Sequence, residues 1–216
     1  MDEKRGTKRI GRHMPLLMTT LVMIGGATIT ALLWKETGER DIESLTVNFE
    51  AAARRAAVNI EHKLDTFQVV MRGVQGFLGA SEEITYDEFT RYIDSLQFPQ
   101  RLQGVLGIAL VRLIPADQIE THVALTRAST FPDYTITPPG IRPSYAPIVY
   151  IEPLEGDNLA ALGFDVLTVE PARSAMNRAL QSNDIAITAP LTLVQDSGRE
   201  ARTSFVMYLP VYREGA

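Results

Sequence analysis

The longest apolar stretch of the chain is an uncharged run from Pro15 to Trp34, with basic residues before it and charged residues after it. As a helix, its 20 residues would rise about 30 Å, the thickness of the hydrocarbon core of a bilayer. The basic excess before the run favours a cytoplasmic N-terminus. The pattern predicts a cytoplasmic basic tail at 1–14, a transmembrane helix at 15–34, and an extracytoplasmic (periplasmic) remainder at 35–216. A signal peptide cleaved after Gly25-Gly26-Ala27 is the alternative.

Behind this run, apolar residues recur every three or four positions, and no proline occurs from Glu36 to Ala80. This spacing is typical of a helix, with one slip relative to a strict heptad. We predict a stalk helix over 35–80 that covers part of its own domain, pairs with a second copy in a homodimer, or does both. The stripe consists of Leu45, Phe49, Ala52, Ala56, Ile60, Leu64, Phe67, Met71, Val74 and Leu78.

Shorter patterns follow the stripe. Thr85-Tyr86-Asp87-Glu88 has the spacing of a capping box and predicts a helix from Tyr86 to about Leu96. Glu170-Pro171 predicts the start of another helix, which ends near Asn183. Three runs rich in β-branched and aromatic residues predict antiparallel strands that would form an α+β sandwich with these helices. The runs are Tyr145–Ile151, Ile185–Val194 and Thr203–Val211.

Composition narrows the possible functions. The residues after Trp34 carry 16 Lys and Arg against 24 Asp and Glu, and this acidity argues against a nucleic-acid partner. The absence of cysteine excludes disulfides and thiolate metal sites. His13, His62 and His122 lie far apart, and no HExxH motif or glycine-rich phosphate loop occurs. We therefore expect no catalytic site, no metal and no cofactor.

The order and spacing of several short blocks resemble the CHASE domain, an extracellular sensing module of membrane receptors that include the plant cytokinin receptors. Three blocks lie in the second half, and two upstream blocks also look similar to the family. They are Tyr145–Tyr150 (YAPIVY), Gly163–Thr168 (GFDVLT) and Ile187–Leu193 (ITAPLTL), with Asn48–Arg55 and Thr85–Phe89 upstream.

The resemblance implies a fold class and an architecture. The fold would be α+β: an N-terminal transmembrane helix continuing into a long stalk helix, followed by two PAS-like subdomains. Residues 81–140 would form the first part of the membrane-distal subdomain, and residues 141–216 would form the sensor core. A second span and a cytoplasmic histidine kinase or diguanylate cyclase would follow in a part of the receptor that is missing from this chain.

The resemblance also implies a ligand site. Asp165 matches the carboxylate that faces the purine ring in cytokinin-binding members, and Ile187 matches an aliphatic residue of the strand that lines this ring. Thr188 lies beside it, and three aromatic side chains are candidate pocket walls: Tyr150, Phe164 and Tyr208. The alternatives are that Asp165 caps a turn before the helix at Pro171 and that the aromatic residues belong to the core.

The predicted function is therefore the ligand-sensing domain of a transmembrane signal-transduction receptor, which binds a small molecule and passes the signal through a dimeric stalk. The alternative is a membrane-anchored module that docks a protein partner without a small ligand. An exported hydrolase is a third class, which the lack of a nucleophile and base at a recognisable spacing disfavours.

Overall fold

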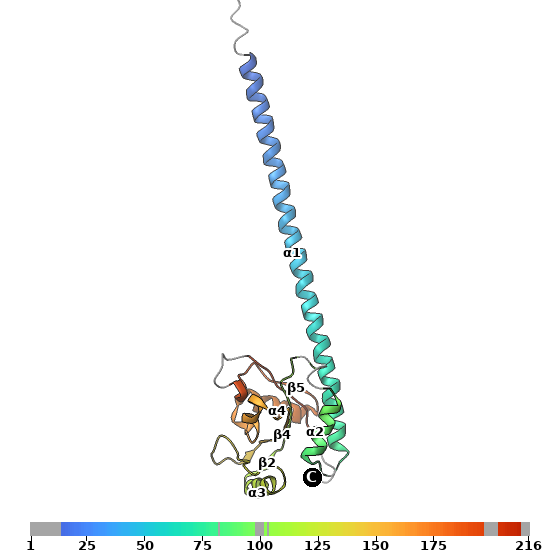
Figure 1. The fold of residues 1–216 in the computed structure, drawn as a ribbon. Helices are drawn as coiled ribbons and strands as arrows, with labels where there is room; N and C mark the ends of the chain where they lie inside the picture. Colours follow the sequence, from blue (N-terminus) through green and yellow to red (C-terminus); the bar gives the residue numbers. More distant parts are fainter. Residues whose placement is uncertain (1–13, 82, 98–101, 103, 197–202, 213–216) are drawn as a thin grey trace, which may run out of the picture. The chain divides into compact units, whose positions relative to one another are not determined.

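The computed structural model describes residues 14–81, 83–97, 102, 104–196 and 203–212 (Figure 1). The predicted basic tail lies outside the described residues except for Met14. The chain divides into two units, Met1–Lys63 and Leu64–Ala216. The domain boundaries expected from the sequence stay predictions.

The helices and strands follow one another along the chain in this order: α1 (Met14–Gly79), α2 (Tyr86–Ser95), β1 (Ile108–Val111), β2 (Ile114–Pro115), η1 (Ala116–Gln118), α3 (Ile119–Ser129), β3 (Ser144–Tyr145), β4 (Ile148–Glu152), η2 (Gly156–Ala161), η3 (Val166–Thr168), α4 (Glu170–Ser182), β5 (Ala186–Ile187), η4 (Val194–Asp196) and β6 (Met207–Tyr208).

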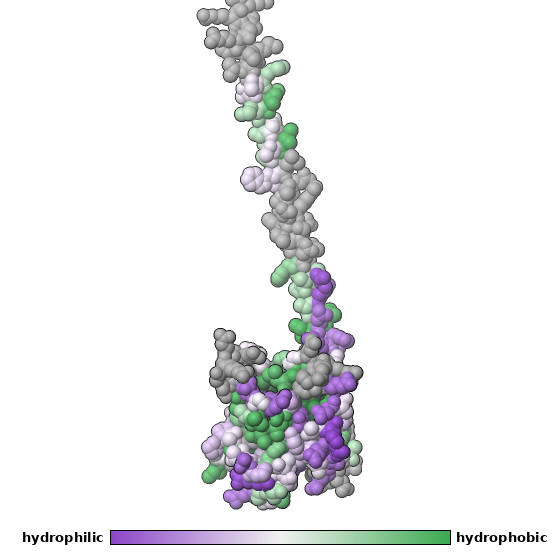
Figure 2. All heavy atoms as spheres, viewed as in Figure 1, coloured by the Kyte–Doolittle hydropathy of each residue, from purple (hydrophilic) through white to green (hydrophobic). Residues whose placement is uncertain are grey.

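The first helix, α1, runs through the predicted stalk and ends at Gly79, one residue before the predicted end of the stalk. In the second unit the apolar stripe of α1 faces the core, and its residues Val74 and Leu78 are buried. In the first unit the stripe is uncovered, because Phe49 is 74% exposed and Ile60 is 59% exposed. Figure 2 shows apolar side chains exposed along the described part of this helix. The stripe thus covers its own domain only from about residue 64 onward.

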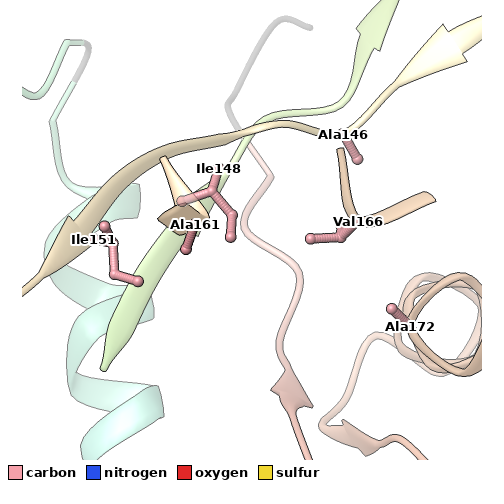
Figure 3. Close-up of a cluster of buried hydrophobic side chains, with 6 residues drawn as sticks. All are labelled: Ala146, Ile148, Ile151, Ala161, Val166 and Ala172. Atoms are coloured by element: carbon pink, nitrogen blue, oxygen red, sulfur yellow. The ribbon is translucent and has the colours of Figure 1, made fainter. Parts of the chain in front are cut away.

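The core of the second unit consists of two apolar clusters. The first gathers side chains from β4, the turns after it and α4, and Figure 3 shows its six buried members. They are Ala146, Ile148, Ile151, Ala161, Val166 and Ala172. Burial of such side chains is the main favourable term in folding, and this cluster stabilises the segment that carries Asp165.

The second cluster joins α1 to α2. Its buried members are Val74, Leu78, Ile84, Phe89 and Ile93. The predicted capping box starts α2: the Thr85 hydroxyl accepts from the Glu88 amide at 3.3 Å, and the Glu88 carboxylate accepts from the Thr85 amide at 3.0 Å. This helix is confirmed.

The predicted fold class is wrong in its β part. The described strands form three separate two-stranded antiparallel sheets, β1-β4, β2-β3 and β5-β6, in a chain that is mainly helical, and no PAS-like fold is shown. Proline explains why the apolar runs do not become long strands, because it lacks the N–H that a ladder needs. β4 begins after Pro147, β5 ends three residues before Pro190, and β6 ends before Pro210.

The predicted transmembrane helix at 15–34 is not found in the part of the chain that the structure describes. A span needs about 20 consecutive, predominantly apolar residues. Among the described residues, no helix is both long enough and apolar enough to cross a membrane.

Gly163 is required by a close approach of two backbone segments. Its φ is +78°, and a Cβ at this position would lie 2.0 Å from the carbonyl oxygen of Thr135. Its own amide donates to the Ile148 carbonyl at 2.9 Å, and its carbonyl accepts from the Thr137 amide at 3.0 Å. A side chain here would push apart the segments that hold Asp165 in place.

We expect Gly163→Ala to lower the free energy of unfolding by about 2–4 kcal/mol, because the left-handed backbone costs ~1–2 kcal/mol and the contact with Thr135 adds to it. Gly156→Ala is the matched control: its φ is +55°, but nothing lies within 4 Å of the place that a Cβ would occupy there. Urea denaturation of both variants checks this. Equal losses would show that the contact with Thr135 imposes no constraint.

Candidate functional site

Asp165 lies in a short segment, 163–166, that is hydrogen-bonded on two sides. On one edge, the Asp165 amide donates to the carbonyl of Thr137 at 2.7 Å. On the other edge, the segment pairs with residues 146–148, and Asp165 forms a β-bridge with Pro147. The backbone around the carboxyl group is therefore fixed by neighbours from two other parts of the chain.

The carboxylate of Asp165 is completely buried. Its Oδ1 atom accepts from the amide of Ala146 at 2.9 Å and from the amide of Leu167 at 3.1 Å. The bond from Leu167 caps the short helix η3, so the turn-capping interpretation of Asp165 is confirmed. Its Oδ2 atom lies 3.3 Å from Nη1 of Arg142 and accepts no hydrogen bond from the described residues.

Arg142 is held in place by the loop to which it belongs. Its Nη2 donates to the carbonyl of Pro138 at 2.8 Å, and its guanidinium carbon lies 5.4 Å from the centre of the Tyr145 ring. The Tyr145 hydroxyl accepts from the Arg142 amide at 3.1 Å and donates to the carbonyl of Gly140 at 2.9 Å. These contacts place a positive charge directly over Asp165.

The predicted aromatic residues separate into two groups. Phe164 and Tyr208 are half-buried and pack against the first cluster. Burial raises the pKa of Tyr208 to about 12, so its hydroxyl is neutral at ordinary pH. Tyr150 packs against the second cluster instead, where its hydroxyl donates to the carbonyl of Ile84 at 3.3 Å.

Ile187, which ends β5, and Thr188, which follows it, also have separate surroundings. The Thr188 hydroxyl accepts from the amide of Val206 at 3.0 Å, so it serves the pairing with the β6 segment. Ile187 lines an open depression of about 560 Å³, and its carbonyl accepts from the guanidinium of Arg178. Figure 2 shows apolar side chains in the middle of the viewed face of this unit. The lining of the depression is Arg178, Gln181, Ser182, Ile185, Ala186 and Ile187.

The structure thus places Asp165, Phe164 and Tyr208 around the first cluster, and it places Tyr150 in the second. Asp165 is not among the residues that line the depression beside Ile187. Whether any of the six predicted residues contacts a ligand stays a prediction.

Two charged residues were missed by the sequence reasoning. Arg142 stands 23 residues before Asp165, in a proline-rich loop that carries no motif. Glu152 ends β4 and is buried, and its Oε1 accepts from the Thr90 hydroxyl at 2.7 Å. Burial, and then the neighbouring Glu152, raises the pKa of Tyr86 to about 12. The signal for Glu152 was a carboxylate at the end of an otherwise apolar run.

The described residues contain no group of three or more His, Asp or Glu side chains that could hold a metal ion. At Asp165, the available chemistry is that of a buried carboxylate beside apolar side chains. Such a group can accept N–H donors or balance a positive charge.

Comparison with protein families gives a match to the CHASE domain over residues 82–216. The match includes the three blocks around Tyr145, Asp165 and Ile187, and it also includes the capping box of α2. It does not extend to the upstream block at Asn48–Arg55. A comparison with curated proteins gave no significant match.

We expect Asp165→Ala to lower the free energy of unfolding by about 3–5 kcal/mol, because it leaves the Arg142 charge and two backbone amides without their acceptor. Asp165→Asn should cost less, since its amide oxygen can still accept from Ala146 and Leu167. Urea denaturation measures both. An Asp165→Ala protein within about 1 kcal/mol of the wild type would contradict a structural role for this carboxylate.

Proposed function

Because the chain belongs to the CHASE-domain family, which is a family of extracellular sensory domains, we propose that it is the sensing part of a signal-transduction receptor and binds a small molecule at Asp165. Residues 82–216, which carry the family match, form the sensing region in this proposal. The family is sensory rather than catalytic, and we propose no enzymatic activity for the chain.

The observation that supports a ligand at Asp165 is the state of its Oδ2 atom. This atom is buried and accepts no hydrogen bond from the described residues, although one arginine nitrogen lies 3.3 Å away. A buried acceptor without a donor is unfavourable, and a charge-assisted hydrogen bond to it contributes about 1.5–3 kcal/mol. A planar heterocycle with an N–H group supplies such a donor.

The surroundings of the carboxylate favour the same class of ligand. Phe164 and Tyr208 pack against the apolar cluster beside Asp165, and flat apolar walls suit an aromatic ring. The Tyr208 hydroxyl, with its raised pKa, adds a neutral polar group. We therefore propose amino-substituted purines and pyrimidines as the first ligands to test.

A thermal-shift screen of the full chain with amino-substituted purines and pyrimidines tests this proposal. A compound at a hundred times its Kd stabilises the folded state by about 2.7 kcal/mol, which raises the Tm of a domain of this size by roughly 5–10 °C. We expect at least one compound to give such a shift and Asp165→Asn to remove most of it.

The matched control is Asp133→Asn, which removes an exposed carboxylate in the same unit and should leave the shift unchanged. A compound that stabilises Asp165→Asn as strongly as the wild type binds elsewhere and would remove Asp165 from the site. A panel without any stabilising compound would contradict an amino-heterocycle as the ligand.

We also propose that two copies of the chain pair along α1. The support is the uncovered apolar stripe of the first unit, in which Phe49, Ala52, Ala56 and Ile60 are exposed on one face. From Leu45 to Leu78 the stripe advances about 3.67 residues per step, which is the spacing of an 11-residue repeat. Such a seam packs nearly straight or slightly right-handed, unlike a heptad coiled coil. Such pairing is also compatible with the alternative function, a module that docks a protein partner, if the partner is a second copy of this chain.

Single cysteines test the pairing, because the chain has none of its own. Ala56→Cys lies on the stripe, and Arg54→Cys lies two residues away on the opposite face of the helix. Under mild oxidation we expect Ala56→Cys to form disulfide-linked dimers several-fold more than Arg54→Cys, read on a non-reducing gel. Equal yields from the two positions would argue against this seam.

A further inference from the structure

The buried carboxylate raises a question of access. Asp165 is completely buried, and its Oδ1 atom is already occupied by two backbone amides. Only Oδ2 remains for a ligand, and the group that stands over Oδ2 is the guanidinium of Arg142. The Arg142 side chain is 21% exposed, whereas the Asp165 side chain is 0% exposed, so Arg142 is the member of the pair that reaches the solvent.

The loop that carries Arg142 is fixed at its two ends. At one end, Thr137 bonds to the segment that carries Asp165. At the other end, the carbonyl of Pro143 accepts from the amide of Ala116 at 3.1 Å. Between these ends, the loop is held by the guanidinium of Arg142 and by the Tyr145 hydroxyl. Ile141, at the tip, is 100% exposed.

We propose that Arg142 is a latch that closes the Asp165 site, and that a ligand enters by replacing the Arg142 guanidinium at Oδ2. This inference rests on the proposed function, because it concerns the regulation of the same site. The ion pair has one contact at 3.3 Å and no hydrogen bond to Oδ2, whereas the guanidinium donates to the loop carbonyl of Pro138 at 2.8 Å. The Arg142 guanidinium therefore balances the charge of the Asp165 carboxylate, but it leaves Oδ2 able to accept a hydrogen bond from a donor with better geometry.

The latch also restricts what can bind. A competitor must donate a hydrogen bond to Oδ2, which the guanidinium does not, and it must compensate for the loss of the Arg142 charge. Once released, Arg142 carries with it residues 138–143, whose tip at Ile141 is free of the core. Occupation of the site is thereby coupled to a change in this loop.

Chemical rescue of the full chain tests the latch with methylguanidinium as the probe. Arg142→Ala removes the guanidinium and leaves Asp165 buried and unpaired, so we expect its Tm to fall by roughly 5–10 °C. Methylguanidinium in the low millimolar range, far below denaturing concentrations, should restore at least half of this loss. The wild-type protein should gain nothing, because its own Arg142 occupies the position.

Three controls define the result. Arg173→Ala removes another arginine, one that donates to the carbonyl of Leu167 at 3.2 Å, and should not be rescued. The double variant Arg142→Ala/Asp165→Asn should also show no rescue. Tetramethylammonium, a cation without N–H donors, should not replace methylguanidinium. Rescue of any control to the same extent would overturn the latch, and so would stabilisation of the wild type equal to that of Arg142→Ala.

If Arg142→Ala does not fold, Arg142→Gln provides the same test, because its shorter amide side chain still vacates the position over Oδ2. An absence of rescue in the variant that folds overturns the proposal. The result is separable from the ligand screen: rescue without any stabilising heterocycle would support the latch and count against the ligand class. A stabilising heterocycle that depends on Asp165, together with failed rescue, would retain the sensing function and remove the latch.

Discussion

The packing of the second unit depends on the hydrogen bonds and the counter-charge that surround the buried carboxylate of Asp165. A carboxylate with no access to water is costly unless hydrogen bonds and a counter-charge surround it. Asp165 receives two backbone amides and an opposing arginine, and these partners come from Ala146, Leu167 and Arg142. Two separate stretches of the sequence, 142–146 and 165–167, must therefore meet for the carboxylate to be accommodated. The same requirement fixes the β4 segment, the turn before α4 and the loop at 138–143 around one point.

The backbone geometry makes this meeting possible. Gly163 allows its segment to pass within van der Waals distance of the Thr135 carbonyl, where a side chain would not fit. The prolines near β4, β5 and β6 shorten each ladder, so the sheets remain two-stranded and polar contacts must hold the unit together where longer ladders would otherwise do so. The ion pair of Arg142 and Asp165 is one such contact, and in our proposal it is also the place where a ligand binds.

This dual role suits a sensor. A ligand shifts a conformational equilibrium only when it interacts differently with the two states. In the proposed latch the two states differ in this way, because a ligand would take the place of Arg142 at Asp165. The uncovered stripe of α1 offers a second interacting surface, in which the apolar face lacks cover within its own unit. Together they support a domain that senses through Asp165 and associates through its helix.

The sequence by itself determined the features that depend on local spacing. The three-to-four residue rhythm of the stripe predicted α1, the Thr85 and Glu88 pair predicted the start of α2, and Asp165 was correctly identified as a possible turn cap. The ordered blocks also predicted the CHASE family. Only the tertiary structure decided that Arg142 faces Asp165, that Tyr150 belongs to a different cluster, and that the apolar runs form two-stranded sheets. Local patterns follow from helical periodicity and capping, whereas a charge pair or a strand pairing depends on which distant segments pack together, and no spacing along the chain records that choice.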